Sequence, residues 1–147
     1  MSWMEPNILI IDDDKEYTKV VQSYFGNRQF KDVLTYHNVM DCLNTHDKRP
    51  DVIFVNYKMN DIEGVRAARM LKRKWSRARV VVMKSSVKAK KRVNKKKFGI
   101  DSIIDVSADM NEFMNEVNYH KTNKITKIVL QCSFFLLSIV GIIFFIL

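Results

Sequence analysis

Apolar and polar positions alternate along the first 120 residues in blocks that predict strands and helices in turn. Three runs, Ile8–Ile11, Val52–Val55 and Val80–Met83, are continuously apolar and rich in β-branched side chains. Such runs are typical of parallel strands that are covered on both faces. Ile103–Ile104 is a shorter run, and Val33–Tyr36 predicts a weaker strand near the edge of the sheet.

Helical stretches separate these runs. They are expected at Asp14–Gly26, Val39–Asp47, Ile62–Trp75, Val87–Phe98 and Asp109–Tyr119. Five alternations of strand and helix predict an α/β fold with a five-stranded, doubly wound parallel sheet and helices on both faces. Ligand sites in such folds gather at the carboxyl ends of the strands.

The helix ends carry their own patterns. Asp13 and Asp109 each precede a glutamate by three positions, the spacing of a capping box, so both are predicted N-caps. Gly26 and Gly99 stand where a helix commonly ends in a residue with positive φ.

The end of the chain has a different character. Its last 20 residues, Ile128–Leu147, contain no charged side chain and are mostly apolar. A helix of that length spans ~30 Å, the hydrocarbon thickness of a bilayer. A buried core helix or a helix lying flat on lipid fits less well, because the run has no polar face.

Basic residues precede this apolar run. Lys121, Lys124 and Lys127 lie just before it, and the positive-inside tendency then places the preceding domain on the cytoplasmic side. We therefore expect a domain at 1–120, a basic juxtamembrane linker at 121–127 with a hinge at Lys121–Thr126, and a single-pass transmembrane tail anchor at 128–147.

The net charge of +9 is concentrated in one stretch. Residues 84–97 contain eight cations and no acid: Lys84, Lys88, Lys90, Lys91, Arg92, Lys95, Lys96 and Lys97. A solvated helix face accounts for three or four lysines, but eight cations favour a surface for anionic lipid headgroups or an acidic protein partner. Nucleic acid ranks last, because no reader motif or interleaved aromatic accompanies the charges.

The remaining composition narrows the function class. Cys42 and Cys132 fall in separate segments and are not expected to pair, which fits a reducing compartment. The N-terminus lacks the basic start and apolar run of a secretory signal. We find no nucleophile–base set, no glycine-rich phosphate loop and no zinc spacing, so an enzyme is not expected.

Two longer segments carry a family resemblance. NILIIDDD (Asn7–Asp14) ends the first strand in acids, and PDVIFVNYKMNDIEG (Pro50–Gly64) ends the third strand at Asn56. A third match is Gly99-Ile100-Asp101. Together these segments resemble the receiver domain of two-component response regulators over roughly residues 6–119, which implies the flavodoxin-like sheet order of that family.

The resemblance also implies a site. In that family two acids after the first strand hold Mg²⁺, and an aspartate at the end of the third strand accepts phosphate. By position the acids correspond to Asp12 and Asp13, and the acceptor corresponds to Asn56. An amide is neutral and a poor nucleophile, so no aspartyl phosphate can form there. It also weakens Mg²⁺ binding, since this hard cation prefers charged oxygens.

The other phosphate-binding positions of the family are altered as well. The hydroxyl position falls on Lys84, or on Ser85 with a one-residue slip, and the lysine position falls on Val106. The aromatic position before it holds Ile103, and the proline position after it holds Ser107. The resemblance therefore implies a degenerate, phosphorylation-independent pseudo-receiver without catalytic residues.

Two hypotheses address the surviving acids. A lysine ammonium, from Lys84 or Lys58, replaces the metal between Asp12 and Asp13 and locks one conformation, because close carboxylates repel. Alternatively, Asp13 is a helix cap worth ~1 kcal/mol and Asp12 is simply solvated. Residual Mg²⁺ binding by this pair is less expected, so neither a metal nor a cofactor is predicted.

These features predict a regulatory adaptor that works through protein contacts at the cytoplasmic membrane face. One alternative is an accessory structural subunit of a large membrane complex. Another is an atypical signalling receiver that still binds Mg²⁺ or a phosphorylated ligand.

Overall fold

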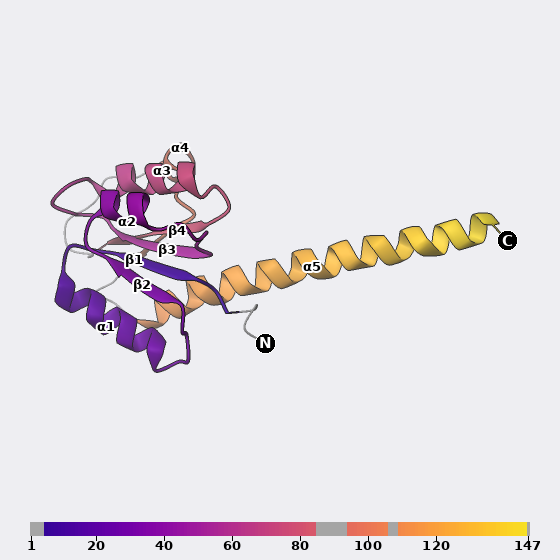
Figure 1. The fold of residues 1–147 in the computed structure, drawn as a ribbon, viewed down its shortest axis with the longest axis horizontal. Coiled ribbons are helices and arrows are strands. Elements are labelled where there is room, and N and C mark those ends of the chain that lie inside the picture. Colours follow the sequence, from indigo (N-terminus) through magenta and orange to yellow (C-terminus); the bar gives the residue numbers. More distant parts are fainter. Residues whose placement is uncertain (1–4, 85–93, 106–108, 147) are drawn as a thin grey trace.

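The computed structural model describes residues 5–84, 94–105 and 109–146, with side chains described as far as residue 138. Strands and helices alternate throughout these parts of the chain (Figure 1). In order they are β1 Ile8–Ile11, α1 Lys15–Gly26, β2 Val33–Tyr36, α2 Val39–Thr45, β3 Val52–Asn56, α3 Gly64–Lys74, β4 Arg79–Lys84, α4 Lys95–Phe98, β5 Ser102–Asp105 and α5 Asn111–Ile146.

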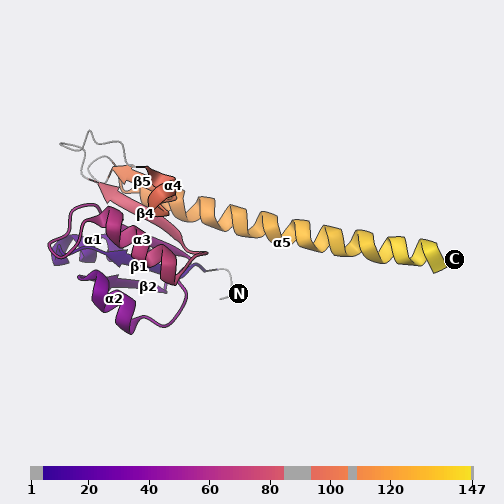
Figure 2. The ribbon, with the colours of Figure 1, turned by 90° about the horizontal axis from the view of Figure 1, so that it is seen from above.

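The five strands form one parallel sheet in the order β2-β1-β3-β4-β5 (Figure 2). The predicted α/β class and the five-stranded parallel sheet are therefore confirmed. Because every strand runs the same way, the strands all end at one edge of the sheet and all begin at the other. We call these the carboxyl edge and the amino edge.

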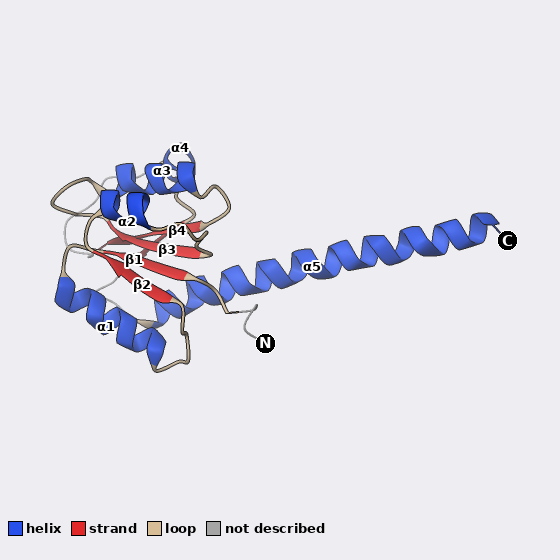
Figure 3. Cartoon of the chain, in the orientation of Figure 1, coloured by secondary structure: helices blue, strands red, loops and turns tan. Residues whose placement is uncertain are grey.

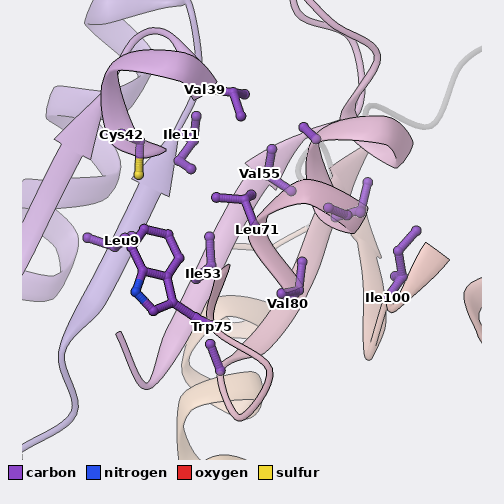
Figure 4. Close-up of a cluster of buried hydrophobic side chains, with 14 of the residues drawn as sticks. Leu9, Ile11, Val39, Cys42, Ile53, Val55, Leu71, Trp75, Val80 and Ile100 are labelled. Carbon is purple, nitrogen blue, oxygen red and sulfur yellow. The ribbon is translucent and has the colours of Figure 1, made fainter. Parts of the chain in front are cut away.

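Each face of the sheet packs against its own helices (Figure 3). On one face, alternate strand residues such as Leu9 and Ile53 pack against Leu71 and Trp75 of the α2–α3 layer (Figure 4). Residues of opposite parity, Phe54 among them, pack against α1 and the first turns of α5. Burial of each large apolar side chain contributes about 1.5–3 kcal/mol, which is why both faces of these strands are apolar in sequence.

The start of α1 corrects a predicted cap. Asp14, rather than Asp13, caps the helix, because its Oδ1 accepts hydrogen bonds from the backbone N–H groups of Glu16 and Tyr17 at 3.0 and 2.9 Å. All three consecutive aspartates are residues that can cap a helix, and the third does so although only Asp13 has the capping-box spacing.

Helix ends elsewhere give a mixed outcome. Gly26 lies inside α1, and the described left-handed residue after that helix is Gln29, with φ 66°. Gly99 does end α4 with φ 69°, as predicted. The first part of the expected helix at Val87–Phe98, residues 87–93, lies outside the described residues.

Helix α5 is continuous from Asn111 to Ile146, so the predicted hinge at Lys121–Thr126 is wrong. That segment contains neither glycine nor proline, and each added residue of a helix gains a backbone hydrogen bond. The helix packs on the sheet through Phe113 and Val117 and then projects away from the domain on the side of the amino edge (Figure 1).

The projecting part of α5 carries exposed apolar side chains. Phe134 is 71% exposed, and the same holds to a lesser degree for Ile128, Val129, Leu130, Phe135, Leu136 and Leu137. Within the part of the chain that the structure describes, no helix has the length and apolar character needed to cross a membrane. The side chains of residues 139–147, the second half of the predicted span, lie outside the described part, and the span stays a prediction.

Candidate functional site

The carboxyl edge brings the sequence-predicted acids and Asn56 together. Ile11 of β1 lies opposite Val55 of β3 in the sheet register, so the next residue of each strand, Asp12 and Asn56, leave the sheet side by side. The Asn56 side-chain amide donates a hydrogen bond to Asp12 Oδ1 at 3.0 Å. Asp12 and Asn56 therefore lie next to each other, as predicted, and form an amide–carboxylate pair.

Asp12 is the most enclosed acid of this cluster, with 3% of its surface exposed. Burial raises its pKa and the charge of Asp13 adds to the rise, whereas hydrogen bonds from the Asp14 N–H and Asn56 work against it. Tyr17 lies nearby, and burial followed by the charge of Asp12 raises the pKa of its phenol to about 12. A further negative charge next to Asp12 would therefore be unfavourable.

Asp13 makes a contact that the sequence did not predict. Its Oδ2 accepts a hydrogen bond from the backbone N–H of Asn60 at 3.0 Å. Asn60 lies in the β3–α3 loop, so this bond ties that loop to the end of β1. A backbone partner 47 positions away leaves no local sequence pattern, which is why sequence reasoning missed Asn60.

Gly64 closes the same loop against Asn56. A Cβ on Gly64 would lie 2.1 Å from the backbone oxygen of Asn56, closer than any real side chain allows. Its N–H donates to the Tyr57 carbonyl at 2.8 Å, and Lys58 and Glu63 form an isolated antiparallel bridge. The Lys58 N–H also donates to Asn56 Oδ1 at 3.3 Å. The spacing from Asn56 to Gly64 therefore reflects a steric requirement of the site.

His37 also reaches this edge and was not predicted from the sequence. Its Nδ1 lies 3.0 Å from the backbone oxygen of Asp12. This contact links the end of β2 to the end of β1 from the side opposite Asn56.

The described residues do not fit a divalent cation well. Among them, no group of three or more histidine, cysteine, aspartate or glutamate side chains is arranged to hold a metal ion. Asp12 Oδ1 already accepts two hydrogen bonds, and the group beside it is a neutral amide that points an N–H donor at it. Mg²⁺ prefers charged oxygens in near-octahedral geometry, and this edge supplies two carboxylates that are each bound by internal donors.

Lys84 ends β4 at the same edge and pairs in register with Asp105 of β5. The described partners of Asp12 and Asp13 are Asn56 and backbone N–H groups, so the lysine lock stays a prediction. Ile103 is half-buried and packs against the α2–α3 layer. Ser85, Val106 and Ser107 lie outside the described residues.

The predicted basic surface is described only in part. Lys95, Lys96 and Lys97 are exposed on α4, whose start is capped by Asn94. Lys88, Lys90, Lys91 and Arg92 lie outside the described residues. Cys42 is buried and Cys132 is exposed on α5, and both are free thiols, as expected.

The fold and the site together define a flavodoxin-like α/β protein with an acidic cluster at the carboxyl edge of its sheet. The family profile of the response regulator receiver domain matches residues 8–118. This chain belongs to the response regulator receiver domain family.

Solved structures agree with the fold. The signal receiver domain of a LuxO repressor protein from Vibrio parahaemolyticus is 15% identical, with a TM-score of 0.71, covering 85% of this chain and 97% of that one. The receiver domain of Francisella response regulator 1452 is 19% identical, with a TM-score of 0.67 and coverage of 81% and 98%. Response regulator TrrA from Thermotoga maritima, solved in complex with Mg²⁺-BeF, is 17% identical, with a TM-score of 0.66 and coverage of 77% and 96%. No curated protein sequence matches the chain significantly.

Proposed function

We propose that this receiver domain works without phosphorylation, as a membrane-anchored adaptor that binds a partner at the cytoplasmic membrane face. The observation that carries the proposal is the Asn56 amide bonded to Asp12 at 3.0 Å, where a phosphate-accepting receiver needs a carboxylate nucleophile. The edge is closed by internal hydrogen bonds from Asn60, Asp14 and Asn56, which supports one fixed conformation.

A phosphorylation assay tests the first half of this proposal. The full chain is incubated with Mg²⁺ and acetyl phosphate, and its intact mass is measured. We expect no phosphoryl adduct on the wild-type chain. Asn56→Asp is the matched control, since it restores a carboxylate at the strand end with almost no change in shape. A wild-type adduct that survives in amounts comparable to the control variant would overturn the proposal.

The anchor is supported by the sequence of α5 and by its exposure. Residues 128–147 carry no charge, three lysines precede them, and the described apolar side chains of this segment are exposed. An isolated helix with apolar side chains on all sides is not stable in water without a partner, and a bilayer is the partner that matches its length.

Flotation tests the anchor. Full-length chain synthesised with neutral phosphatidylcholine vesicles should float with them and resist extraction at alkaline pH. Leu130→Lys combined with Leu137→Lys should abolish this, since each lysine at a membrane-buried position costs about 2.5–3.5 kcal/mol. The matched control is Lys15→Gln combined with Lys31→Gln. Equal flotation of the double-lysine variant and the wild type would remove the anchor from the proposal.

The second candidate function is that of a structural subunit of a large membrane complex. The basic α4 surface, with its exposed Lys95, Lys96 and Lys97, is compatible with both an adaptor and a structural subunit. Purification from native membranes in mild detergent, followed by mass spectrometry, distinguishes the two. A stoichiometric complex that survives detergent favours the subunit, and a chain that purifies alone favours the adaptor. The Mg²⁺-binding alternative is disfavoured by the donor set described above.

A further inference from the structure

A cavity lies at the amino edge, where the strands begin, whereas Asn56 lies at the carboxyl edge, where they end. It has a volume of about 240 Å³ and lies between the segments that lead into β3, β4 and β5 and the turns of α5 just before Ile128. Small-molecule sites are mostly apolar and begin at about 300 Å³. This cavity is smaller and its lining is mainly charged, which fits a compact anionic group.

The lining carries six arginine and lysine side chains against two aspartates. Asp101 pairs with Lys72 at 2.8 Å, and Asp51 lies 3.3 Å from Lys124 and 3.4 Å from His120. Both acids are therefore already matched by cations of the cavity.

Arg79 is also matched, by a residue outside the lining. Its guanidinium lies 2.6 Å from Glu116 and stacks over the ring of Tyr119 at 4.3 Å. No described residue forms an ion pair with the remaining three cations, Arg49, Arg77 and Lys127, and all three are exposed. The cavity thus has three positive charges to offer a ligand.

The position of the cavity along α5 indicates where such a ligand comes from. Lys124 and Lys127 line the cavity and lie one turn or less before Ile128, so they are about 2–6 Å from it along the helix axis. If the hydrocarbon layer begins at Ile128, that distance falls inside the headgroup layer, which is about 5–8 Å thick. The cavity then opens at the level of the lipid phosphates.

We propose that this cavity binds the phosphate monoester headgroup of an anionic lipid, such as phosphatidic acid. A phosphate monoester carries about two negative charges at neutral pH, which suits three unmatched cations better than the single charge of a phosphodiester. Arginine at two of the three positions adds paired N–H donors that match phosphate oxygens. The proposal rests on the proposed membrane anchor.

The test uses the full chain in nonionic detergent, titrated with dioctanoyl phosphatidic acid and, separately, with the soluble analogue glycerol 3-phosphate. Binding is followed by native mass spectrometry and by ³¹P NMR. We expect saturable binding of one phosphatidic acid, at least about tenfold tighter than glycerol 3-phosphate because the acyl chains pack on α5. Dioctanoyl phosphatidylglycerol, a phosphodiester, should bind more weakly than phosphatidic acid.

The test variant is the triple Arg49→Gln, Arg77→Gln, Lys127→Gln. We expect it to weaken phosphatidic acid binding by about 100-fold, since each cation near a headgroup contributes substantially to binding. The control triple Lys15→Gln, Lys31→Gln, Arg66→Gln removes the same charge from exposed positions outside the cavity and should change binding less than about twofold. Thermal unfolding of both triples confirms that they fold.

Three outcomes overturn this inference alone, and a fourth overturns the anchor on which it rests. Equal losses in the two triples would show a diffuse charge effect without a site. Glycerol 3-phosphate binding as tight as phosphatidic acid would assign the cavity to a free phosphate. A chain that floats on neutral vesicles but does not bind phosphatidic acid would refute the cavity while leaving the anchor intact, and a chain that fails to float would refute the anchor itself.

Discussion

The two edges of the sheet hold polar clusters of opposite character. At the carboxyl edge, Asp12 accepts hydrogen bonds from the Asn56 amide and the Asp14 N–H, and Asp13 accepts one from the Asn60 N–H, so neutral internal donors hold both acids. At the amino edge, Arg49, Arg77 and Lys127 surround a cavity without a described acidic partner. The acids of the carboxyl edge thus have internal hydrogen-bond donors, whereas three cations of the amino edge have no described acidic partner.

The largest effect is expected at Gly64, which holds the carboxyl edge closed. In Gly64→Ala the new Cβ would meet the Asn56 carbonyl at 2.1 Å, so the β3–α3 loop must move. We expect a loss of unfolding free energy on the order of 3 kcal/mol or more, measured by urea denaturation. Gly26→Ala is the control, because nothing lies within 4 Å of a Cβ there, and it should be neutral or stabilising by up to about 1 kcal/mol. Similar losses for the two substitutions would contradict the steric role of Gly64.

At the amino edge, Asp51 is the acid that holds the cavity wall together. Burial alone would raise its pKa, but His120, the Asn7 N–H and Lys124 outweigh burial and lower the pKa to about 2. A lowered pKa means that the charged form stabilises the fold above pH ~4, and that this stabilisation disappears as the pH falls through about 2. Asp51→Asn should therefore cost about 2 kcal/mol at pH 7 and almost nothing near pH 2. A stability difference that stays constant across this range would exclude the ion pairs as its origin.

Asn56→Asp tests whether the carboxyl edge is closed by charge matching. The substitution replaces an N–H donor with a second carboxylate against Asp12, whose pKa is already raised by burial. In EDTA we expect a loss of about 1 kcal/mol at pH 7, from the lost hydrogen bond and the added repulsion. Mg²⁺ should recover this loss in the variant and leave the wild type unchanged, as followed by the thermal midpoint. An identical Mg²⁺ response in both chains would show that the amide does not close this edge to cations.

The smallest effect separates two neighbouring aspartates. Asp14→Ala removes the N-cap of α1 and should cost about 1 kcal/mol. Asp13→Ala leaves the cap intact and loses one bond to the Asn60 N–H, so α1 should keep its amide-exchange protection. The reverse ranking of helix protection in the two variants would return the cap to Asp13.

Local patterns predicted the parts of the fold that depend on neighbouring residues. The run Ile8–Ile11 coincides with β1, because four consecutive apolar and largely β-branched side chains are typical of a strand buried on both faces. The pairing of Asp12 with Asn56 was also predictable, since parallel strands bring their carboxyl ends together. The continuity of α5 was also predictable, since residues 121–127 lack helix breakers; the change from polar to apolar composition near Ile128 does not interrupt the helix.

Contacts set by register were not predictable from sequence. The amino-edge cavity draws Arg49, Arg77, Lys124 and Asp101 from four separate segments, and Arg49 and Arg77 have no local pattern that marks them. The bond from Asn60 to Asp13 is of the same kind. Charge runs stood out in the sequence, whereas scattered single cations that the sheet gathers at one edge did not.

The unbroken α5 has a mechanical consequence. Its 36 residues form a rod of about 54 Å that starts in the core at Phe113 and includes the whole of the predicted linker. A flexible linker lets a domain rotate freely, but a continuous helix fixes the rotation of the domain about the helix axis. Since each helical residue advances about 100° around the axis, the number of residues between Val117 and Ile128 sets the direction of the domain around the axis of α5. The length of this part of α5 would then determine the direction in which the basic α4 surface faces relative to the apolar end of the helix.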